Sequence, residues 1–78
     1  MALFAAKEYT DDLDQLSAAE KTQLKATLDD LTSDSARTPL AANRFKRFVS
    51  KIGPAAGDVL TKIIVNVISE TAKKYMGS

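Results

Sequence analysis

The chain offers few residues that could do chemistry, and they do not form the pattern of a catalytic site. It contains no His and no Cys, which removes the usual acid/base side chain at neutral pH, the thiol nucleophile and the commonest zinc ligands. Nucleophile and phosphate-binding motifs such as GxSxG, SxxK and GxxxxGK do not occur in it. We therefore expect a protein that is not an enzyme and that uses no cofactor.

Two pairs of adjacent acids, Asp11/Asp12 and Asp29/Asp30, could offer oxygen ligands to a cation. Neighbouring residues on a helix point about 100° apart, so neither pair can clamp one ion without other ligands. The spacing of a calcium-binding EF-hand loop is also missing. We interpret both pairs as solvated surface charge and expect no metal site.

The segment NRFKRFVSK mixes basic and aromatic residues, as polyanion-binding surfaces do. Its bases are Arg44, Lys46, Arg47 and Lys51. At helical spacing Arg44, Arg47 and Lys51 form one stripe, whereas the two phenylalanines turn inward and cannot stack on nucleic-acid bases. Two interpretations remain: a nucleic-acid contact through the phosphates, or a basic outer face that pairs with acids of the same chain or of a neighbour. We favour the second.

Charge is divided unevenly along the chain. Residues 1–36 hold eight acids and three bases, and residues 37–78 hold two acids and eight bases, so the halves carry net charges of −5 and +6. Opposite charges of this kind can hold two helical layers together within one chain, or they can favour head-to-tail contact between copies.

Helix signals dominate the sequence, and no alternating segment bounded by hairpin turns indicates a strand. Ser17 and Glu20 have the spacing of a capping box, and Gly53-Pro54 is typical of the end of a helix. A hydrophobic content of 45% with 27% charged residues is typical of a folded chain rather than a disordered one. We predict an all-α fold with a single helical domain over residues 1–78. It is a small bundle of three to four helices, at residues 2–15, 18–32, 39–52 and 54–75.

The segment KIIVNVI, within the last predicted helix, is the most apolar part of the chain. A membrane-spanning helix needs about 20 consecutive apolar residues, but Asp58, Lys62, Asn66 and Glu70 interrupt this region every four residues. The N-terminus also lacks the basic and long apolar regions of a secretory signal. We expect a cytoplasmic protein that does not span a membrane.

The apolar side chains of this last helix cover about half of its circumference, more than the stripe of about 100° that one-sided packing needs. Two neighbours are therefore implied: one is another helix of the chain, and the second is either the N-terminal helix or the same helix of another copy. Small helical domains without disulfides or metals often complete their core by oligomerising. We predict homo-oligomerisation through Val59, Leu60, Ile63, Ile64, Val67 and Ile68.

The order of features over residues 18–75 is similar to that of a known module. A leucine helix AEKTQLKATLDDL, a short turn ending in Pro, a basic helix ANRFKRFVSKI and the segment GPAAGDVLTKIIVNVISETAKK follow one another. Together they resemble the short helical C-terminal module of bacterial abortive-infection proteins of the AbiTii type and of other predicted phage-defence effectors. The most specific part is the small-residue stretch before the aliphatic helix. The resemblance implies an accessory assembly module without catalytic residues, and the N-terminal helix lies outside its pattern.

These observations predict a non-catalytic protein–protein interaction or homo-oligomerisation module, which the resemblance would make the assembly domain of a bacterial defence system. One alternative is a small nucleic-acid-binding helical protein that uses the basic helix over residues 44–51. A second alternative is a membrane-active effector whose amphipathic helix lies flat on a bilayer. That helix, however, lacks the Lys/Arg-rich face beside Trp or Phe that is typical of such proteins.

Overall fold

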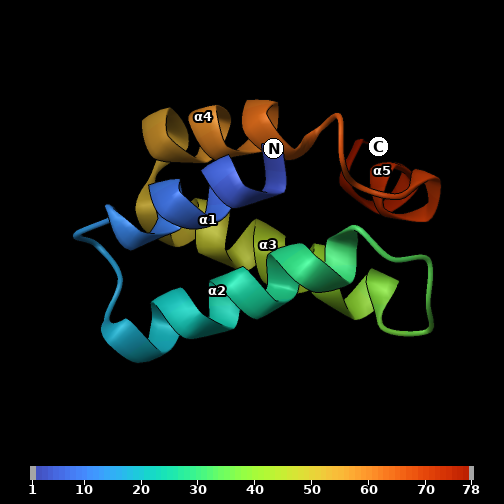
Figure 1. The fold of residues 1–78 in the computed structure, drawn as a ribbon, viewed down its shortest axis with the longest axis horizontal. Helices are drawn as coiled ribbons and strands as arrows, with labels where there is room; N and C mark the ends of the chain where they lie inside the picture. Colours follow the sequence, from blue (N-terminus) through green and yellow to red (C-terminus); the bar gives the residue numbers. More distant parts are fainter. Residues whose placement is uncertain (1, 78) are drawn as a thin grey trace.

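The computed structural model describes residues 2–77 of the chain and the side chains of residues 3–75. Over that range it is all-helical, with five α-helices and no strand (Figure 1). They are α1 (Ala2–Asp11), α2 (Ala18–Leu31), α3 (Thr38–Ile52), α4 (Pro54–Ile64) and α5 (Glu70–Gly77). The predicted all-α class is confirmed, but the predicted three to four helices become five because the last one is divided in two.

Four of the helices form a ring around a common core. α1 packs on α2 and α4, α3 packs on the same two helices, and α5 lies against α3 at one end of the ring (Figure 1). The largest fully buried side chains are Phe45, Leu24, Leu28, Leu31, Leu60, Ile64, Thr10 and Thr38. Because α1 and α3 both pack on α4, the two neighbours that its wide apolar arc requires lie within the chain.

α1 ends at Asp11, short of the predicted limit at residue 15. Asp11 and Asp12 place negative charge at the C-terminal end of the helix, where the helix dipole opposes it. The carbonyl of Asp11 has no helical partner and instead accepts a hydrogen bond from the ammonium group of Lys21 at 2.8 Å. Residues 12–17 therefore separate α1 from α2.

α2 begins where the capping box predicts. The hydroxyl of Ser17 accepts a hydrogen bond from the backbone N–H of Glu20 at 3.2 Å, and the Glu20 carboxylate accepts one from the N–H of Ser17 at 2.8 Å. The predicted capping box is thus confirmed. Glu20 also forms an ion pair with Lys51, so the first turn of α2 is joined to the last turn of α3.

α3 and α4 are separated by Gly53 alone. Gly53 has a φ of 93°, a left-handed conformation that only glycine adopts at little cost, and Pro54 then begins α4. One turn later, the buried Gly57 lies against Val49: a Cβ atom at residue 57 would be 2.6 Å from Cγ1 of Val49. The absence of a side chain at Gly57 therefore lets the two helices cross closely.

The prediction of one helix over residues 54–75 is wrong. α4 ends at Ile64, a turn follows over residues 65–69, and α5 packs against α3 (Figure 1). The turn brings Ile68 and Ala72 into the core, where they are 8% and 0% exposed. A continuous helix would extend beyond the ring of helices and leave these apolar residues outside the core. The turn buries them instead.

Two features of the sequence account for this break. Residues 63–68 are all β-branched except for Asn66, and such residues are relatively poor helix formers. Ser69 then acts as the N-cap of α5, because its hydroxyl accepts a hydrogen bond from the N–H of Ala72 at 3.2 Å.

Candidate functional site

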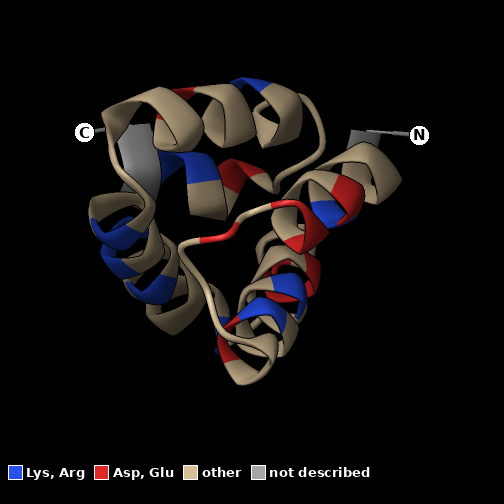
Figure 2. Ribbon diagram, turned by 90° about the vertical axis from the view of Figure 1, so that its left-hand side faces the viewer, with Lys and Arg blue, Asp and Glu red and all other residues tan. Residues whose placement is uncertain are grey.

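Charge is segregated on the surface of the protein. Figure 2 shows Lys and Arg gathered on α3, which contains no Asp or Glu, and most of the acidic residues on α1, α2 and the turn between them. The ion pair between Lys51 and Glu20 joins the acidic and basic halves of the chain. This pair supports the interpretation of α3 as a basic outer face that contacts acids of the same chain.

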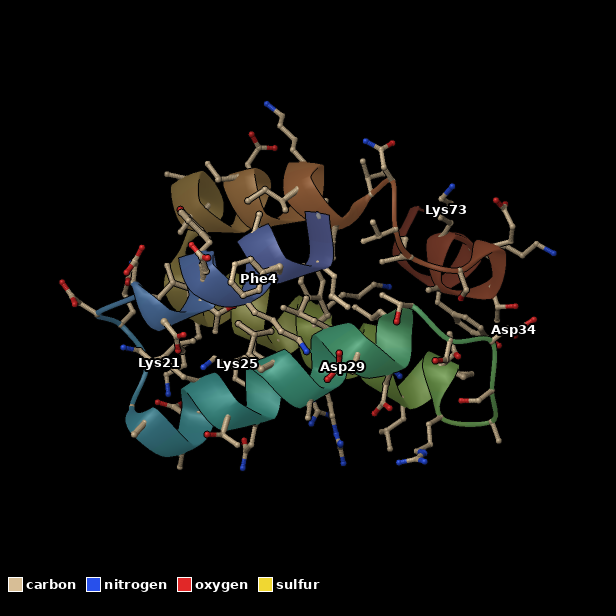
Figure 3. The ribbon with its side chains drawn as sticks, viewed as in Figure 1. Phe4, Lys21, Lys25, Asp29, Asp34 and Lys73 are labelled. Atoms are coloured by element: carbon tan, nitrogen blue, oxygen red, sulfur yellow. The ribbon has the colours of Figure 1, made fainter. Side chains whose placement is uncertain are left out.

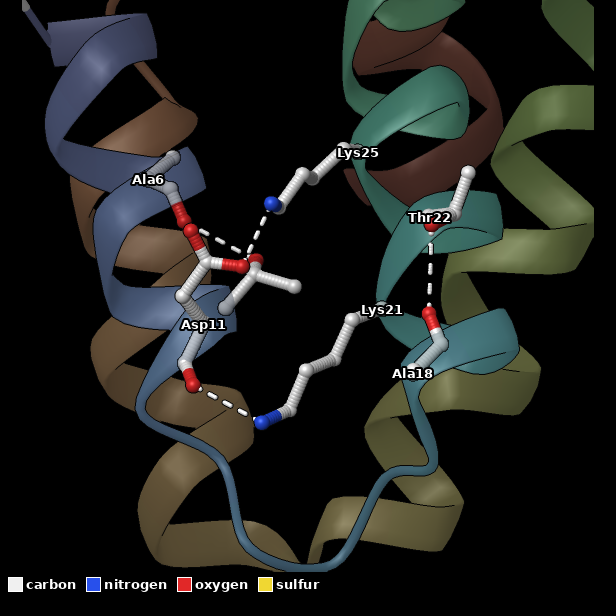
Figure 4. A network of polar contacts seen from close by, with 7 residues as sticks. Ala6, Asp11, Ala18, Lys21, Thr22 and Lys25 are labelled. Atoms are coloured by element: carbon white, nitrogen blue, oxygen red, sulfur yellow. Dashed lines mark hydrogen bonds and ion pairs between the residues drawn. The ribbon is translucent and has the colours of Figure 1, made fainter.

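The lysines of α1 and α2 pair within those two helices. Lys7 lies 2.7 Å from the carboxylate of Asp29, which is labelled on α2 in Figure 3. Lys25 pairs with the Asp11 carboxylate (Figure 4). Lys21 donates to the Asp11 carbonyl beside that pair (Figure 4). The three bases of residues 1–36 therefore all contact oxygens of α1 or α2, and these contacts hold α1 against α2.

The basic stripe predicted on α3 lines a groove of about 470 Å³ between α2 and α3. The lining is formed by Arg44, Arg47, Phe48 and Lys51 of α3 and by Glu20, Gln23, Ala26 and Thr27 of α2. Arg44 and Arg47 are exposed, and their side chains make no hydrogen bond or ion pair with another described residue. These two guanidinium groups can therefore meet an anion in this groove.

Lys51 is already neutralised. Its ammonium group donates a hydrogen bond to the Glu20 carboxylate. That bond, followed by the one from the backbone N–H of Ser17, lowers the pKa of Glu20 from 4.5 to about 2. The carboxylate is thus ionised at neutral pH and places a negative charge at the edge of the groove.

Lys46, the fourth predicted base, faces a different groove. This one has a volume of about 460 Å³ and lies between α3, α4 and α5. Its lining is Phe45, Val49, Thr61, Val65 and Ile68, with the charges of Lys46 and Lys73. The predicted polyanion-binding set is therefore divided: three members line the α2–α3 groove, and Lys46 lines a mainly apolar groove on the other flank of α3.

The predicted oligomer interface is divided as well. Its members in the core are Leu60, Ile64 and Ile68. Val59 is 43% exposed, and Ile63 and Val67 are half-buried. While the fold is intact, only these last three can contact a second copy, because the buried three pack inside their own chain.

Four exposed large hydrophobic residues of the described part of the chain lie outside the predicted interface: Phe4, Leu40, Val65 and Tyr75. Phe4 of α1 is 63% exposed, and Val65 at the end of α4 is 43% exposed. Helical spacing carries the signal for Phe4, since it lies about 200° around α1 from the buried Ala6. Helical spacing also places Val65 beyond the edge of the apolar arc of the last predicted helix, but its place in the apolar groove depends on where α4 ends.

One member of each acid pair has a structural partner. Asp11 is held by Lys25 and Asp29 by Lys7, and in the described part of the chain no three acidic side chains lie close enough together to hold a metal ion. None of the helices over the described residues combines the length and the apolarity that crossing a membrane requires.

Comparison with known proteins gives a family. A family model described as an uncharacterized protein conserved in bacteria (DUF2321) matches residues 1–76, and the chain belongs to this bacterial family. No curated protein and no solved structure matches the chain.

Proposed function

We propose that this protein is a non-catalytic interaction module that assembles with copies of itself. The observation that carries the proposal is the apolar surface left on α4 and on the turn after it once the core is complete. Val59 and Val65 are each 43% exposed there, and Ile63 and Val67 are half-buried. A finer form of the proposal, an assembly module of a bacterial defence system, rests on the resemblance to abortive-infection modules.

The size of the domain supports this proposal. A chain of 78 residues without cysteine has a thin core and no disulfide to reinforce it. An interface of ordinary size covers about 800 Å² of each partner, a substantial part of the 4699 Å² that this chain exposes. Such an interface would take in α4 together with a neighbouring groove, and the apolar groove beside Val65 supplies the concave surface that close packing needs.

The experiment is a mass measurement by light scattering after size exclusion, at concentrations from a few micromolar to about 1 mM. We expect a mass that rises from one chain to at least two, and the double variant Val59→Asp/Val65→Asp to stay at one chain. Asn66→Asp is the control, because it adds one negative charge beside Val65 without removing apolar surface. A wild-type chain that stays monomeric at the highest concentration contradicts the proposal.

The unpaired guanidinium groups of Arg44 and Arg47 favour a second candidate function, polyanion binding in the α2–α3 groove. Exposed bases without internal partners can neutralise phosphates and release counterions. We expect a fluorescent single-stranded oligonucleotide to bind with an affinity that falls as salt rises, and Arg44→Gln/Arg47→Gln to reduce the slope of log affinity against log salt by about 1.4. The control is Lys62→Gln on α4, and equal binding by both variants excludes this groove as the binding site.

A further inference from the structure

We infer that the apolar groove between α3, α4 and α5 receives the exposed face of α1 from a second copy of the chain. This inference rests on the proposed self-assembly and names its two surfaces. We call the groove lined by Val49, Val65 and Ile68 the acceptor groove, and the exposed face of α1 formed by Phe4, Ala5 and Glu8 the Phe4 face.

The acceptor groove selects for an apolar group accompanied by negative charge. Its apolar lining is made of Phe45, Val49, Val65 and Ile68, and no acidic side chain lines it. Its charges are the ammonium groups of Lys46 and Lys73. An apolar anchor would be removed from water against this apolar lining, while an adjacent carboxylate would stay close to the lysines.

The Phe4 face has this chemistry. Phe4 is 63% exposed, more than any other large hydrophobic side chain in the described part of the chain, and aromatic residues are typical anchors of interfaces. Glu8 lies four residues later on the same side of α1, and it forms no ion pair or hydrogen bond through its side chain with another described residue.

The charges of the two surfaces complement each other. Lys46 also has no ion pair with a described residue, and Lys73 has only the exposed Glu70 on its own helix, at 3.4 Å. Seating Phe4 in the acceptor groove would bring Glu8 toward these lysines. The acidic half of one copy would then face the basic half of the next, which is the head-to-tail contact that the division of charge along the chain favours.

The two surfaces lie on different sides of the molecule. α1 and α3 occupy opposite sides of the ring in Figure 2, and the ring of Phe4 faces the viewer in Figure 3, in front of α1 and away from α3. When the Phe4 face of a second copy occupies the acceptor groove of a first copy, the Phe4 face of the first copy and the acceptor groove of the second copy both stay free. Contacts of this heterologous kind produce open chains or closed rings rather than a symmetric dimer.

The test mixes two variants that each lack one surface. Phe4→Ser removes the anchor and keeps the acceptor groove, whereas Val65→Asp places a charge in the groove and keeps the anchor. Both positions are exposed, so we expect both chains to fold, which circular dichroism checks. Light scattering after size exclusion, together with native mass spectrometry, reports the mass of each variant alone and of their mixture.

We expect each variant alone to assemble at least about tenfold more weakly than the wild type, and the equimolar mixture to form a dimer with one chain of each kind. Leu40→Asp on α3 is the matched control, since Leu40 is an exposed large hydrophobic residue like Val65 but does not line the groove, and it should assemble like the wild type. Lys46→Glu should weaken assembly by about two- to fivefold, and mixing it with a Glu8→Lys chain should restore part of the loss.

Several results would overturn the inference and leave self-assembly standing. The first is a Phe4→Ser chain that assembles as strongly as the wild type. The second is loss of assembly in Val59→Asp but not in Val65→Asp. The third is a mixture of Phe4→Ser and Val65→Asp that stays monomeric while the wild type assembles. Other ligands test the acceptor groove as well: an acidic peptide that contains phenylalanine, and a fatty acid. If either one binds saturably and with the same affinity to the Val65→Asp variant and to the wild type, the acceptor groove is not the binding site. A wild-type chain that stays monomeric to about 1 mM overturns the inference and the proposed function together.

Discussion

The backbone N–H of Ser69 donates a hydrogen bond to the carbonyl oxygen of Leu31 at 2.9 Å. Leu31 is the last residue of α2, where helical carbonyls have no partner within their own helix. Close by, the hydroxyl of Thr71 donates to the Asp34 carboxylate at 2.9 Å. The start of α5 is thus fixed to the end of α2, and this contact sets where the last helix lies against α3.

Replacing the cap at this point should loosen α5. Ser69→Ala keeps the backbone bond to Leu31 but removes the side-chain acceptor for the N–H of Ala72, and loss of such a cap costs about 1 kcal/mol. We expect the free energy of unfolding, measured by urea titration, to fall by about that amount, with faster amide exchange in α5. Ser50→Ala is the control, because Ser50 is exposed within α3. Unchanged exchange in α5 would contradict the capping role of Ser69.

Helix limits that depend on neighbouring residues could be predicted from the sequence. Ser17 and Glu20 satisfy each other's backbone groups within one turn, and Gly53 supplies the positive φ that ends α3. The break between α4 and α5 could not be predicted in the same way. Thr71 and Asp34 are 37 residues apart, and a periodic pattern of apolar residues contains no information about such a contact.

For the candidate site, too, features set by neighbouring residues could be predicted from the sequence, and features set by tertiary contacts could not. The stripe of Arg44 and Arg47 comes from helical spacing alone and was predicted. The acceptor groove requires Val65 and Ile68 on a turn and α5 against α3, so a continuous last helix would not form it. Its apolar lining could be recognised only after the tertiary fold placed that turn.

The contact between Gly57 and Val49 predicts an unusual response to a helix-favouring substitution. Alanine normally stabilises a helix by about 0.8 to 1 kcal/mol relative to glycine. Here the new Cβ would lie 2.6 Å from a methyl group of a stiff β-branched side chain, and such overpacking costs about 1 to 3 kcal/mol. We expect Gly57→Ala to lower the free energy of unfolding by about 1 kcal/mol in urea titrations.

The same reasoning predicts a change of sign when the clash is removed. In a Val49→Ala background, Gly57→Ala should stabilise the protein by up to about 1 kcal/mol, because only the propensity gain is left. A double-mutant cycle with the four chains measures this coupling directly. Stabilisation by Gly57→Ala in the wild-type background would show that α3 and α4 do not cross as closely as described.

The lowered pKa of Glu20 predicts how stability depends on pH. Its hydrogen bonds with Lys51 and with the N–H of Ser17 hold the folded-state pKa at about 2, below the ordinary 4.5. A group with a depressed folded-state pKa contributes stability that is fully present above its ordinary pKa and is lost as pH falls toward the folded-state value. The contribution of Glu20 should therefore be complete at pH 7 and decline between pH 4.5 and about 2.

Glu20→Gln isolates this charge, because glutamine can still accept the capping-box bond from Ser17. We expect the variant to be less stable than the wild type at pH 7 and the difference in free energy of unfolding to shrink below pH 4.5 and vanish near pH 2. Urea titrations at pH 7, 4, 3 and 2 measure it, with Glu8→Gln as the exposed control that has no ion pair with a described residue. A difference that stays constant over this range would mean that the Glu20–Lys51 pair does not stabilise the fold through its charge, and the junction of α2 with α3 would then depend on packing and on the capping box alone.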